Sequence, residues 1–365
     1  MNARVRSIDV LRTIALVVMV FVHFCENLAG YTPDIAGFGA PLFVFLSGAS
    51  YFLWSDAKLA RGSDPQDVSK VSVRRGLFLF GAGFLFNVFI WLPEDVFNWD
   101  VLTFIGCALL VLNIFRRASV AICVVVSVLA VLLSPVLQHM AGYLAFWEQG
   151  HFDYDWTLSD VLVGFLVTGY FPLFPWLGLS LAGYVCASRL YARDETDAAR
   201  TRSAKRLALI GVAVAALSVI LVVTRPGTLG VAASRFFLGW DLYPPSVEYV
   251  LGTVGMAITL FAIGFQYLDL RPAPRQLDGV LDVAESFSRY SLTIYVLHHL
   301  VHIWPLWIYG ICQGEDTTEY WQTALPLWAA SVLAVVFLLG CWLVFHKLGQ
   351  RRIWALEGCM RWVCD

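Results

Sequence analysis

Five polar side chains capable of acid–base or hydrogen-bonding chemistry interrupt the first apolar run of the sequence. They are Asp9, Arg12, His23, Glu26 and Asn27. At about 100° per residue in an α-helix, all five fall within roughly 100° of one another on one face. His23 lies about 21 Å along the helix axis from Asp9. The spacing therefore predicts a helix with an acid and a base near one end and an imidazole deeper along the same face.

The apolar surroundings of this stripe limit what it can do. A charge at membrane depth costs about 3 to more than 10 kcal/mol unless it faces protein or water, so we expect the stripe to line an interior cavity. A neutral imidazole there can accept a proton at physiological pH. The alternative is that the charges mark the ends of the helix and that His23 is a structural histidine, hydrogen-bonded between helices.

A second group of chemically active residues lies near the C-terminus and consists of Tyr295, His298, His299 and His302. His298 and His302 are four residues apart and share a helix face. Counted from the inner end of its helix, His302 is about 20 Å deep, close to the depth of His23. Two imidazoles so spaced can bind zinc, but no HExxH carboxylate accompanies them and no third ligand is evident. We therefore expect no metal.

Four further polar residues lie at informative depths. Asn87 is expected about 18 Å into the third apolar run, where an amide either contacts a reacting group or bridges two helices. Arg74, Arg75 and Arg116 lie close to the inner ends of apolar runs. Basic residues there usually set topology and touch anionic lipid, and they would also suit the phosphates of an anionic cofactor.

The elements that must position these residues are transmembrane helices. The 365 residues are 59% hydrophobic and only 14% charged, whereas soluble domains carry about 25% charged residues. We predict an all-α, polytopic membrane protein with about ten helices in one bundle and a single domain over residues 1–365. The expected spans are residues 9–30, 36–55, 75–93, 100–115, 118–138, 169–188, 207–224, 246–268, 289–309 and 323–346.

Charge distribution predicts the orientation of these spans. Of the 25 Lys and Arg residues, 23 lie in alternate connections, and Arg225 and Arg235 are the exceptions. Basic residues are retained on the cytoplasmic side, so both termini are expected in the cytoplasm, in a bacterial inner membrane. The first run lacks a cleavage site and is interpreted as a retained helix. The net charge of −2 argues against a nucleic-acid partner.

Two features interrupt the regular series of spans. The apolar segment 158–169 is too short to cross alone, and a re-entrant segment is tolerated only where protein or a cavity covers its backbone. Paired prolines follow in segments 170–176 and 243–246. Because proline suits the first turn of a helix, we interpret both segments as helix starts.

Motifs along most of the chain resemble those of the heparan-α-glucosaminide N-acetyltransferase catalytic-domain family. The first is the run Arg6-Ser7-Ile8-Asp9-Val10-Leu11-Arg12, which resembles the R-x-S-x-D-x-x-R opening of the family and is followed by Met19-Val20 and His23. Further matching motifs occur in the same order as in the family, at residues 40–48, 99–106, 171–178, 243–246 and 291–299. Thr13 stands where the family has Gly. The position of His23 is Asn in lysosomal animal members but more often His in bacterial ones, which favours His23 as the working residue.

The resemblance implies a membrane acyltransferase. In this family cytosolic acetyl-CoA gives its acetyl group to an amine or hydroxyl of a glycan or amino-sugar acceptor on the other side of the bilayer. A thioester is already activated, so the enzyme must mainly deprotonate the nucleophile and stabilise the oxyanion. The implied partners are therefore acyl-CoA, the sugar acceptor and the lipid bilayer. The sequence leaves the oligomeric state open, a homodimer included.

If the chain is an acetyltransferase, each candidate residue has an expected role. His23 is the general base or carries the acetyl group itself. His298, His299 and Asn87 contact the oxyanion or orient the acceptor. The remaining residues shape the inner half of the path and meet the CoA phosphates; they are Asp9, Arg12, Arg74, Arg75 and Arg116.

The alternative to an enzyme is a multi-pass transporter. A conduction path would also explain charges within the membrane and broken helices. Many transporters contain two-fold internal repeats, and none is convincing in this sequence. The acyltransferase is therefore the preferred hypothesis, and release of free CoA from acetyl-CoA would distinguish it from a transporter.

Overall fold

The regular structure of the chain is almost entirely helical. The computed structural model describes residues 4–148, 150–193, 195–228, 239–271, 274–348 and 355–365. Arg235, one of the exceptions to the charge alternation, lies outside these residues. The helices form two compact units, the first made of residues up to Phe43 together with Arg271–Val363 and the second of Val44–Leu270. The prediction of a single domain stays a prediction.

Eight helices of the described residues are long and apolar enough to cross a membrane, or nine if a bent pair counts as one span. The chain is thus a multi-pass integral membrane protein. Every expected span overlaps a helix, but the fourth, α4 (Val101–Phe115), has only 15 residues, so the predicted count of ten is not reached. The eight are α1 (Arg6–Ala29), α2 (Ala36–Ala60), α3 (Pro65–Phe86), α5 (Val120–Ala141), α8 (Asp197–Thr228), α10 (Val247–Gly264), α12 (Ser291–Gln313) and α13 (Leu327–Leu348).

The helix α3 begins ten residues earlier than expected. The side chain of Asp64 accepts a hydrogen bond from the backbone N–H of Gln66 at 2.6 Å, and Pro65 occupies the first helical position. This combination of an acidic N-cap and proline is a strong helix start. Arg74 and Arg75 therefore lie inside a helix and not in the connection before it.

The bent pair is formed by α6 (Leu158–Val163) with the π-helix η4 (Gly164–Thr168) and by α7 (Leu173–Leu190), which meet at 42°. Its first half is the short apolar segment that the sequence predicts. The link between the halves is held by Phe171, whose backbone N–H donates to the carbonyl of Trp99 at 2.9 Å. The segments before α4 and α7, both part of the motifs above, are thus in contact.

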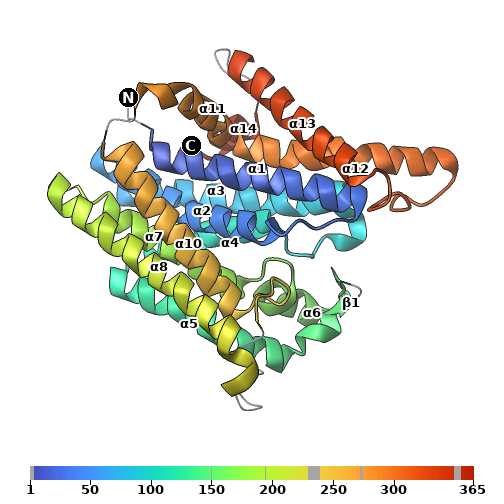
Figure 1. Cartoon of the computed structure of the whole chain (residues 1–365), viewed down its shortest axis with the longest axis horizontal. Helices are drawn as coiled ribbons and strands as arrows, with labels where there is room; N and C mark the ends of the chain where they lie inside the picture. The colour runs from blue at the N-terminus through green and yellow to red at the C-terminus, as the bar shows by residue number, and fades with distance from the viewer. Residues whose placement is uncertain (1–3, 149, 194, 229–238, 272–273, 349–354) are drawn as a thin grey trace. The chain divides into compact units, whose positions relative to one another are not determined.

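The first unit is built around α1. Leu16, Val20, Phe24 and Leu28 recur every four residues of α1 and enter a buried core. The helices α11 (Asp278–Arg289), α12 and α13 contact α1 and contribute the other side of this core, and Figure 1 shows them around it. The apolar face of α1 lies next to its polar face. The helix therefore both packs into the core and carries the candidate reactive side chains.

A C-terminal helix fixes the start of α12. One carboxylate oxygen of Glu357, in α14 (Leu356–Cys364), accepts hydrogen bonds from the backbone N–H groups of Leu292 and Thr293 at 2.8 and 3.0 Å. The first N–H groups of a helix have no partner within the helix, so Glu357 acts as a remote cap. Neither α11 nor α14 was predicted, because their charged residues interrupt the apolar pattern.

Small residues allow close helix packing in the second unit. A Cβ atom at Gly48 of α2 or at Gly183 of α7 would lie 1.8 Å from a carbonyl oxygen of the other helix. Such glycine contacts are typical of helices packing in membranes. The helices α8 and α10 run side by side (Figure 1), and α5 and α8 leave most of their apolar side chains exposed, as lipid-facing helices do.

Short elements complete the described structure. A strand pair, β1 (Trp147–Glu148) and β2 (His151–Phe152), was not predicted and forms a two-residue antiparallel ladder. The remaining short helices are η1 (Asn87–Trp91), η2 (Pro93–Asp95), η3 (Tyr143–Phe146), η5 (Phe265–Asp269) and η6 (Arg275–Leu277).

Candidate active site

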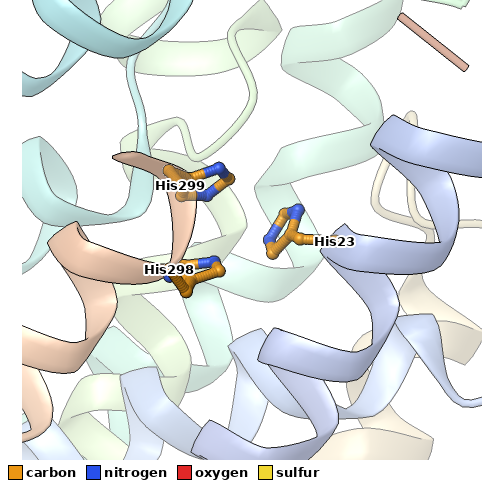
Figure 2. A group of neighbouring side chains, drawn as sticks. All are labelled: His23, His298 and His299. Atoms are coloured by element: carbon orange, nitrogen blue, oxygen red, sulfur yellow. The ribbon is translucent and has the colours of Figure 1, made fainter. Parts of the chain in front are cut away.

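Three imidazoles from two distant segments meet inside the first unit. The ring of His23 on α1 lies 4.6 Å from that of His299 and 5.4 Å from that of His298 on α12, measured between centroids. His298 and His299 are 4.0 Å apart. Figure 2 shows the ring of His23 pointing toward the two rings of α12. The fold thus brings together the three histidines that the sequence nominates.

Burial differs between the members of this cluster. His298 and His299 are buried, whereas His23 is only half-buried. His23 is therefore the member whose surface a bound molecule can reach most easily. The two buried imidazoles lie beside this partly exposed one, both on α12.

His302 has a different role from the one its spacing suggests. Its Nδ1 lies 2.5 Å from the carbonyl oxygen of His298, which can only accept, so Nδ1 carries the proton. Its Nε2 lies 2.9 Å from Nδ2 of Asn27 and accepts a hydrogen bond from that amide. His302 is thus neutral and committed on both sides, and the Asn27–His302 pair ties α1 to α12 one turn beyond His23.

His298 is held from one side only. Its Nδ1 lies 3.3 Å from the carbonyl oxygen of Ile294 and donates to it. Its Nε2, which then has a lone pair, is buried and has no hydrogen-bond partner among the described residues. A buried polar atom without a partner is uncommon. This nitrogen is an acceptor and not a donor, so His298 in this form cannot donate to an oxyanion.

The sequence predicts that His298 and His302 would be the two ligands of any metal ion. In the structure, His298 lies close to His23 and His299 instead. Ligand nitrogens of His23, His298 and His299 all lie within 4.8 Å of one another. The third imidazole that the sequence lacked near α12 comes from α1. His23 is thus a possible third ligand that spacing along α12 does not reveal, and the prediction of no metal stays a prediction.

The inner end of the polar stripe is a network of charges. Arg4 donates to both carboxylate oxygens of Asp9, at 2.7 and 3.0 Å, and Arg12 donates to the hydroxyl of Ser288 at 3.1 Å. Burial lowers the pKa of Arg4, but the hydrogen bond and the attraction to Asp9, with a smaller contribution from Glu285, outweigh it and raise the pKa. Asp9 is thus paired with Arg4, and Arg12 contacts α11.

Thr13, the residue after Arg12, also contacts α11. Its hydroxyl lies 2.8 Å from the carbonyl oxygen of Asp9 and 3.0 Å from that of Ala284. A glycine could not form either contact. Thr13 therefore adds a polar attachment between α1 and α11 next to Arg12.

Asn87 belongs to the second unit and is fully buried at the end of α3. Its Nδ2 donates to the carbonyl of Val96 at 3.0 Å, while its Oδ1 has no partner among the described residues. The amide therefore ties the end of α3 to the loop before α4. This is the structural interpretation of Asn87, and it leaves one acceptor oxygen uncommitted.

The three arginines of the second unit lie in different surroundings. Arg74 lines an open cavity of about 390 Å³ together with Lys70 and Arg117. The guanidinium of Arg75 lies 4.7 Å from the ring centroid of Trp54. Arg116 donates to the carbonyl of Pro65 at 3.0 Å. Only Arg74 of the three thus lines the basic cavity, which Gln66, Ser69 and Val73 complete.

Sequence reasoning missed Lys70 and Arg117 as part of this cavity. Gln66, Lys70 and Arg74 follow one another at intervals of four residues and share a face of α3. The signal was present in the sequence, but it was hidden because the segment before residue 75 was interpreted as a connection. Recognising Asp64 and Pro65 as a helix start would have revealed it.

Comparison with known proteins connects this geometry to a family. A family model described as "Heparan-alpha-glucosaminide N-acetyltransferase, catalytic" matches residues 4–222, which is more than half of the chain. The matched range includes His23, Asn87 and Arg74, but it ends before α12. No curated protein matches the chain. The contribution of His298 and His299 therefore comes from the geometry and not from the family match.

Proposed function

Because this chain belongs to the heparan-α-glucosaminide N-acetyltransferase catalytic family, we propose that it moves an acetyl group from cytosolic acetyl-CoA to an amine or hydroxyl of a sugar-like acceptor outside. The observation that carries the proposal is the position of His23. It is a half-buried imidazole within a multi-pass membrane protein, on a polar helix face and against two further imidazoles.

The proposed reaction needs one proton acceptor. His23 takes the proton of the acceptor amine or hydroxyl while that atom bonds to the thioester carbonyl carbon. The tetrahedral intermediate collapses, the carbon–sulfur bond breaks, and the CoA thiolate leaves and takes a proton from the imidazolium. In the alternative route a His23 nitrogen attacks the thioester carbon first and CoA leaves as the thiolate. The acetyl group then passes from His23 to the acceptor, and the proton of the acceptor ends on the CoA thiolate. Both routes regenerate neutral His23.

The neighbouring residues are proposed to divide the remaining work. His298 offers the lone pair of Nε2, so it can accept a hydrogen bond from the acceptor substrate or from protonated His23. Donors for the oxyanion must come from other groups, and we assign this role to His299. The uncommitted atom of Asn87 is an acceptor oxygen, so this amide is not assigned to the oxyanion. This assignment refines the sequence-based one, in which His298 was also an oxyanion contact.

The basic cavity of the second unit is the proposed site of the CoA phosphates. Lys70, Arg74 and Arg117 are exposed there and present three cationic groups around one space. Charge-assisted hydrogen bonds from such groups are the usual means of holding phosphate. Arg75 and Arg116, engaged with Trp54 and Pro65, would support this wall of the cavity.

We propose further that the two units form one membrane domain. Its ten crossings would include α4 and the bent pair, with both termini in the cytoplasm of a bacterial cell and the basic cavity on the same side. Asp9 and Arg12 would then shape the inner entrance of the path. The alternation of basic residues along the sequence supports this orientation.

The function can be tested with purified protein in lipid nanodiscs and radiolabelled acetyl-CoA. The acceptors are glucosamine, which offers an amine, and N-acetylglucosamine, which offers only hydroxyls. We expect label in one sugar and an equal amount of free CoA. A transporter would release no CoA. Acetyl-CoA that stays intact with both acceptors would contradict the proposal.

A further inference from the structure

The cluster of His23, His298 and His299 has a second chemical capacity beyond acid–base work. We propose that these three imidazoles form a binding site for a borderline transition-metal ion, above all Zn²⁺, and that the bound metal blocks acetyl transfer. The binding claim is independent of the proposed function. The blocking claim rests on it, because it requires His23 to be the reacting group.

The geometry of the cluster is close to that of a zinc site. The three ligand nitrogens lie within 4.8 Å of one another. In a tetrahedral site with Zn–N bonds of about 2.0–2.1 Å, ligand nitrogens are roughly 3.4 Å apart. The rings therefore need to approach by little more than about 1 Å, which rotation of the His23 side chain can provide. The ligands come from two helices held together by the Asn27–His302 pair.

His298 forms the kind of hydrogen bond that a metal-bound histidine usually forms. A metal-bound histidine almost always donates its other ring N–H to a carbonyl or carboxylate, which fixes its tautomer. His298 donates Nδ1–H to the carbonyl of Ile294, and its Nε2 is buried without a partner among the described residues. The Nε2 atom of His298 is thus in the tautomeric form that can bind a metal ion.

The donor set determines which ions fit. Imidazole nitrogen suits zinc, copper, nickel and cobalt, whereas magnesium and calcium prefer oxygen. Three histidines leave a fourth coordination position open, as in catalytic zinc sites. Glu26, one turn along α1 from His23 and partly exposed, supplies negative charge near the site and so reduces the penalty of placing a cation there.

Coordination and catalysis exclude each other at His23. A metal ion takes the same nitrogen lone pair that would accept the proton of the acceptor or attack the thioester. No electron transfer is involved, and release of the metal restores the free imidazole. Zinc should therefore inhibit acetyl transfer reversibly, and a chelator should restore it.

The binding claim is tested by titrating metal-free protein in nanodiscs with Zn²⁺ in a calorimeter, and with Co²⁺ in a spectrophotometer. We expect about one ion per chain and, for cobalt, the intense visible absorption of a tetrahedral complex. Loss of an outer-shell partner alone typically weakens metal binding by about 10–100-fold, so the variants His299→Ala and His298→Gln, which remove a ligand, should weaken binding by at least that much. His298→Gln keeps a polar side chain, so it guards against a folding defect. His346→Ala, in which an exposed histidine outside the cluster is removed, is the matched control and should bind as the wild type does.

Two results would overturn the binding claim. One is the absence of a stoichiometric complex in the wild type, and the other is equal affinity in wild type, His299→Ala and His298→Gln. The blocking claim is overturned if saturating zinc leaves the rate of acetyl transfer unchanged. Failure of the proposed function is distinguishable, because protein that transfers no acetyl group at all can still show the metal titration.

Discussion

The histidine cluster of the first unit and the basic cavity of the second use their side chains in opposite ways. His298, His299 and His302 are buried, and hydrogen bonds to backbone or amide groups hold His298 and His302. Lys70, Arg74 and Arg117 are exposed, long and flexible, and they surround an open space. The first arrangement suits a reaction that requires fixed geometry, and the second suits attraction of an anion.

The two sites also differ in how far apart their residues lie along the sequence. The cavity residues lie mostly on one helix, at intervals that a helix face explains. The histidines lie more than 270 positions apart along the chain, and only the packing of α1 against α12 unites them. The fixed geometry of the histidine cluster therefore depends on tertiary contacts, whereas the basic cavity depends mainly on the spacing of residues along one helix. The predictions that follow test this contrast.

The largest effect is expected from removing the reacting imidazole. His23→Ala should lower the rate of acetyl transfer by about 10²–10⁴-fold, the usual contribution of general acid–base catalysis, and should leave acetyl-CoA binding unchanged. The measurement is single-turnover transfer with radiolabelled acetyl-CoA, alongside equilibrium binding. His346→Ala serves as the control and should retain full activity. Transfer at the wild-type rate by His23→Ala would refute the assignment.

The next effect concerns the rigidity of the cluster. Asn27→Leu leaves Nε2 of His302 buried without its donor, which costs about 1–3 kcal/mol of stability, so Tm should fall. Replacing both partners, in Asn27→Leu with His302→Leu, should recover most of that loss because no polar atom is then left unsatisfied. Thermal unfolding in nanodiscs measures both. If the double variant were less stable than Asn27→Leu, the pair would not be the contact described.

A smaller effect is expected at the basic cavity. Arg74→Ala should raise the KM for acetyl-CoA roughly fivefold with kcat unchanged, since an exposed ion pair contributes up to about 1 kcal/mol. The effect should shrink as salt increases. Arg75→Ala is the matched control, because Arg75 lies over Trp54, and it should change KM less. Steady-state kinetics at two ionic strengths make the comparison, and equal changes in both variants would argue against the cavity as the phosphate site.

The smallest effect is a pH dependence in the segment between α3 and α4 of the second unit. Burial, with the nearby charge of Glu94, raises the pKa of Asp95 to about 6. A carboxyl whose pKa is higher in the folded state stabilises the protein when protonated, and this contribution is lost as pH rises through about 6. The Tm of wild type should therefore fall relative to that of Asp95→Asn between pH 4 and pH 7. A constant difference across this range would exclude the shift.

Much of the fold follows from the sequence because apolar length and charge alternation are local signals. All ten expected spans overlap helices, and the short segment before Tyr170 was recognised as unable to cross alone. The start of α3 at Pro65 was missed because its first turns are polar. The helices α11 and α14 were missed for the same reason, since amphipathic helices at the surface have no long apolar run.

The sequence predicts which histidines belong to the candidate site, but not which of them lie next to one another. His23, His298 and His299 were all nominated, yet spacing favoured His298 with His302. The structure turns His302 toward Asn27 and its own backbone, and it brings His23 against His298 and His299 instead. Periodicity places residues on a helix face, but only tertiary packing decides which of them meet a neighbouring helix.

The claim that α1 and α12 build one catalytic centre is tested most directly by a double-mutant cycle between His23 and His299. The single-turnover rate of acetyl transfer is measured for wild type, His23→Ala, His299→Ala and the double variant. Residues that act as a unit are strongly non-additive, so we predict that the double variant is about as slow as His23→Ala alone. Rate losses that simply multiply would show that the two histidines act independently, and this would contradict the account.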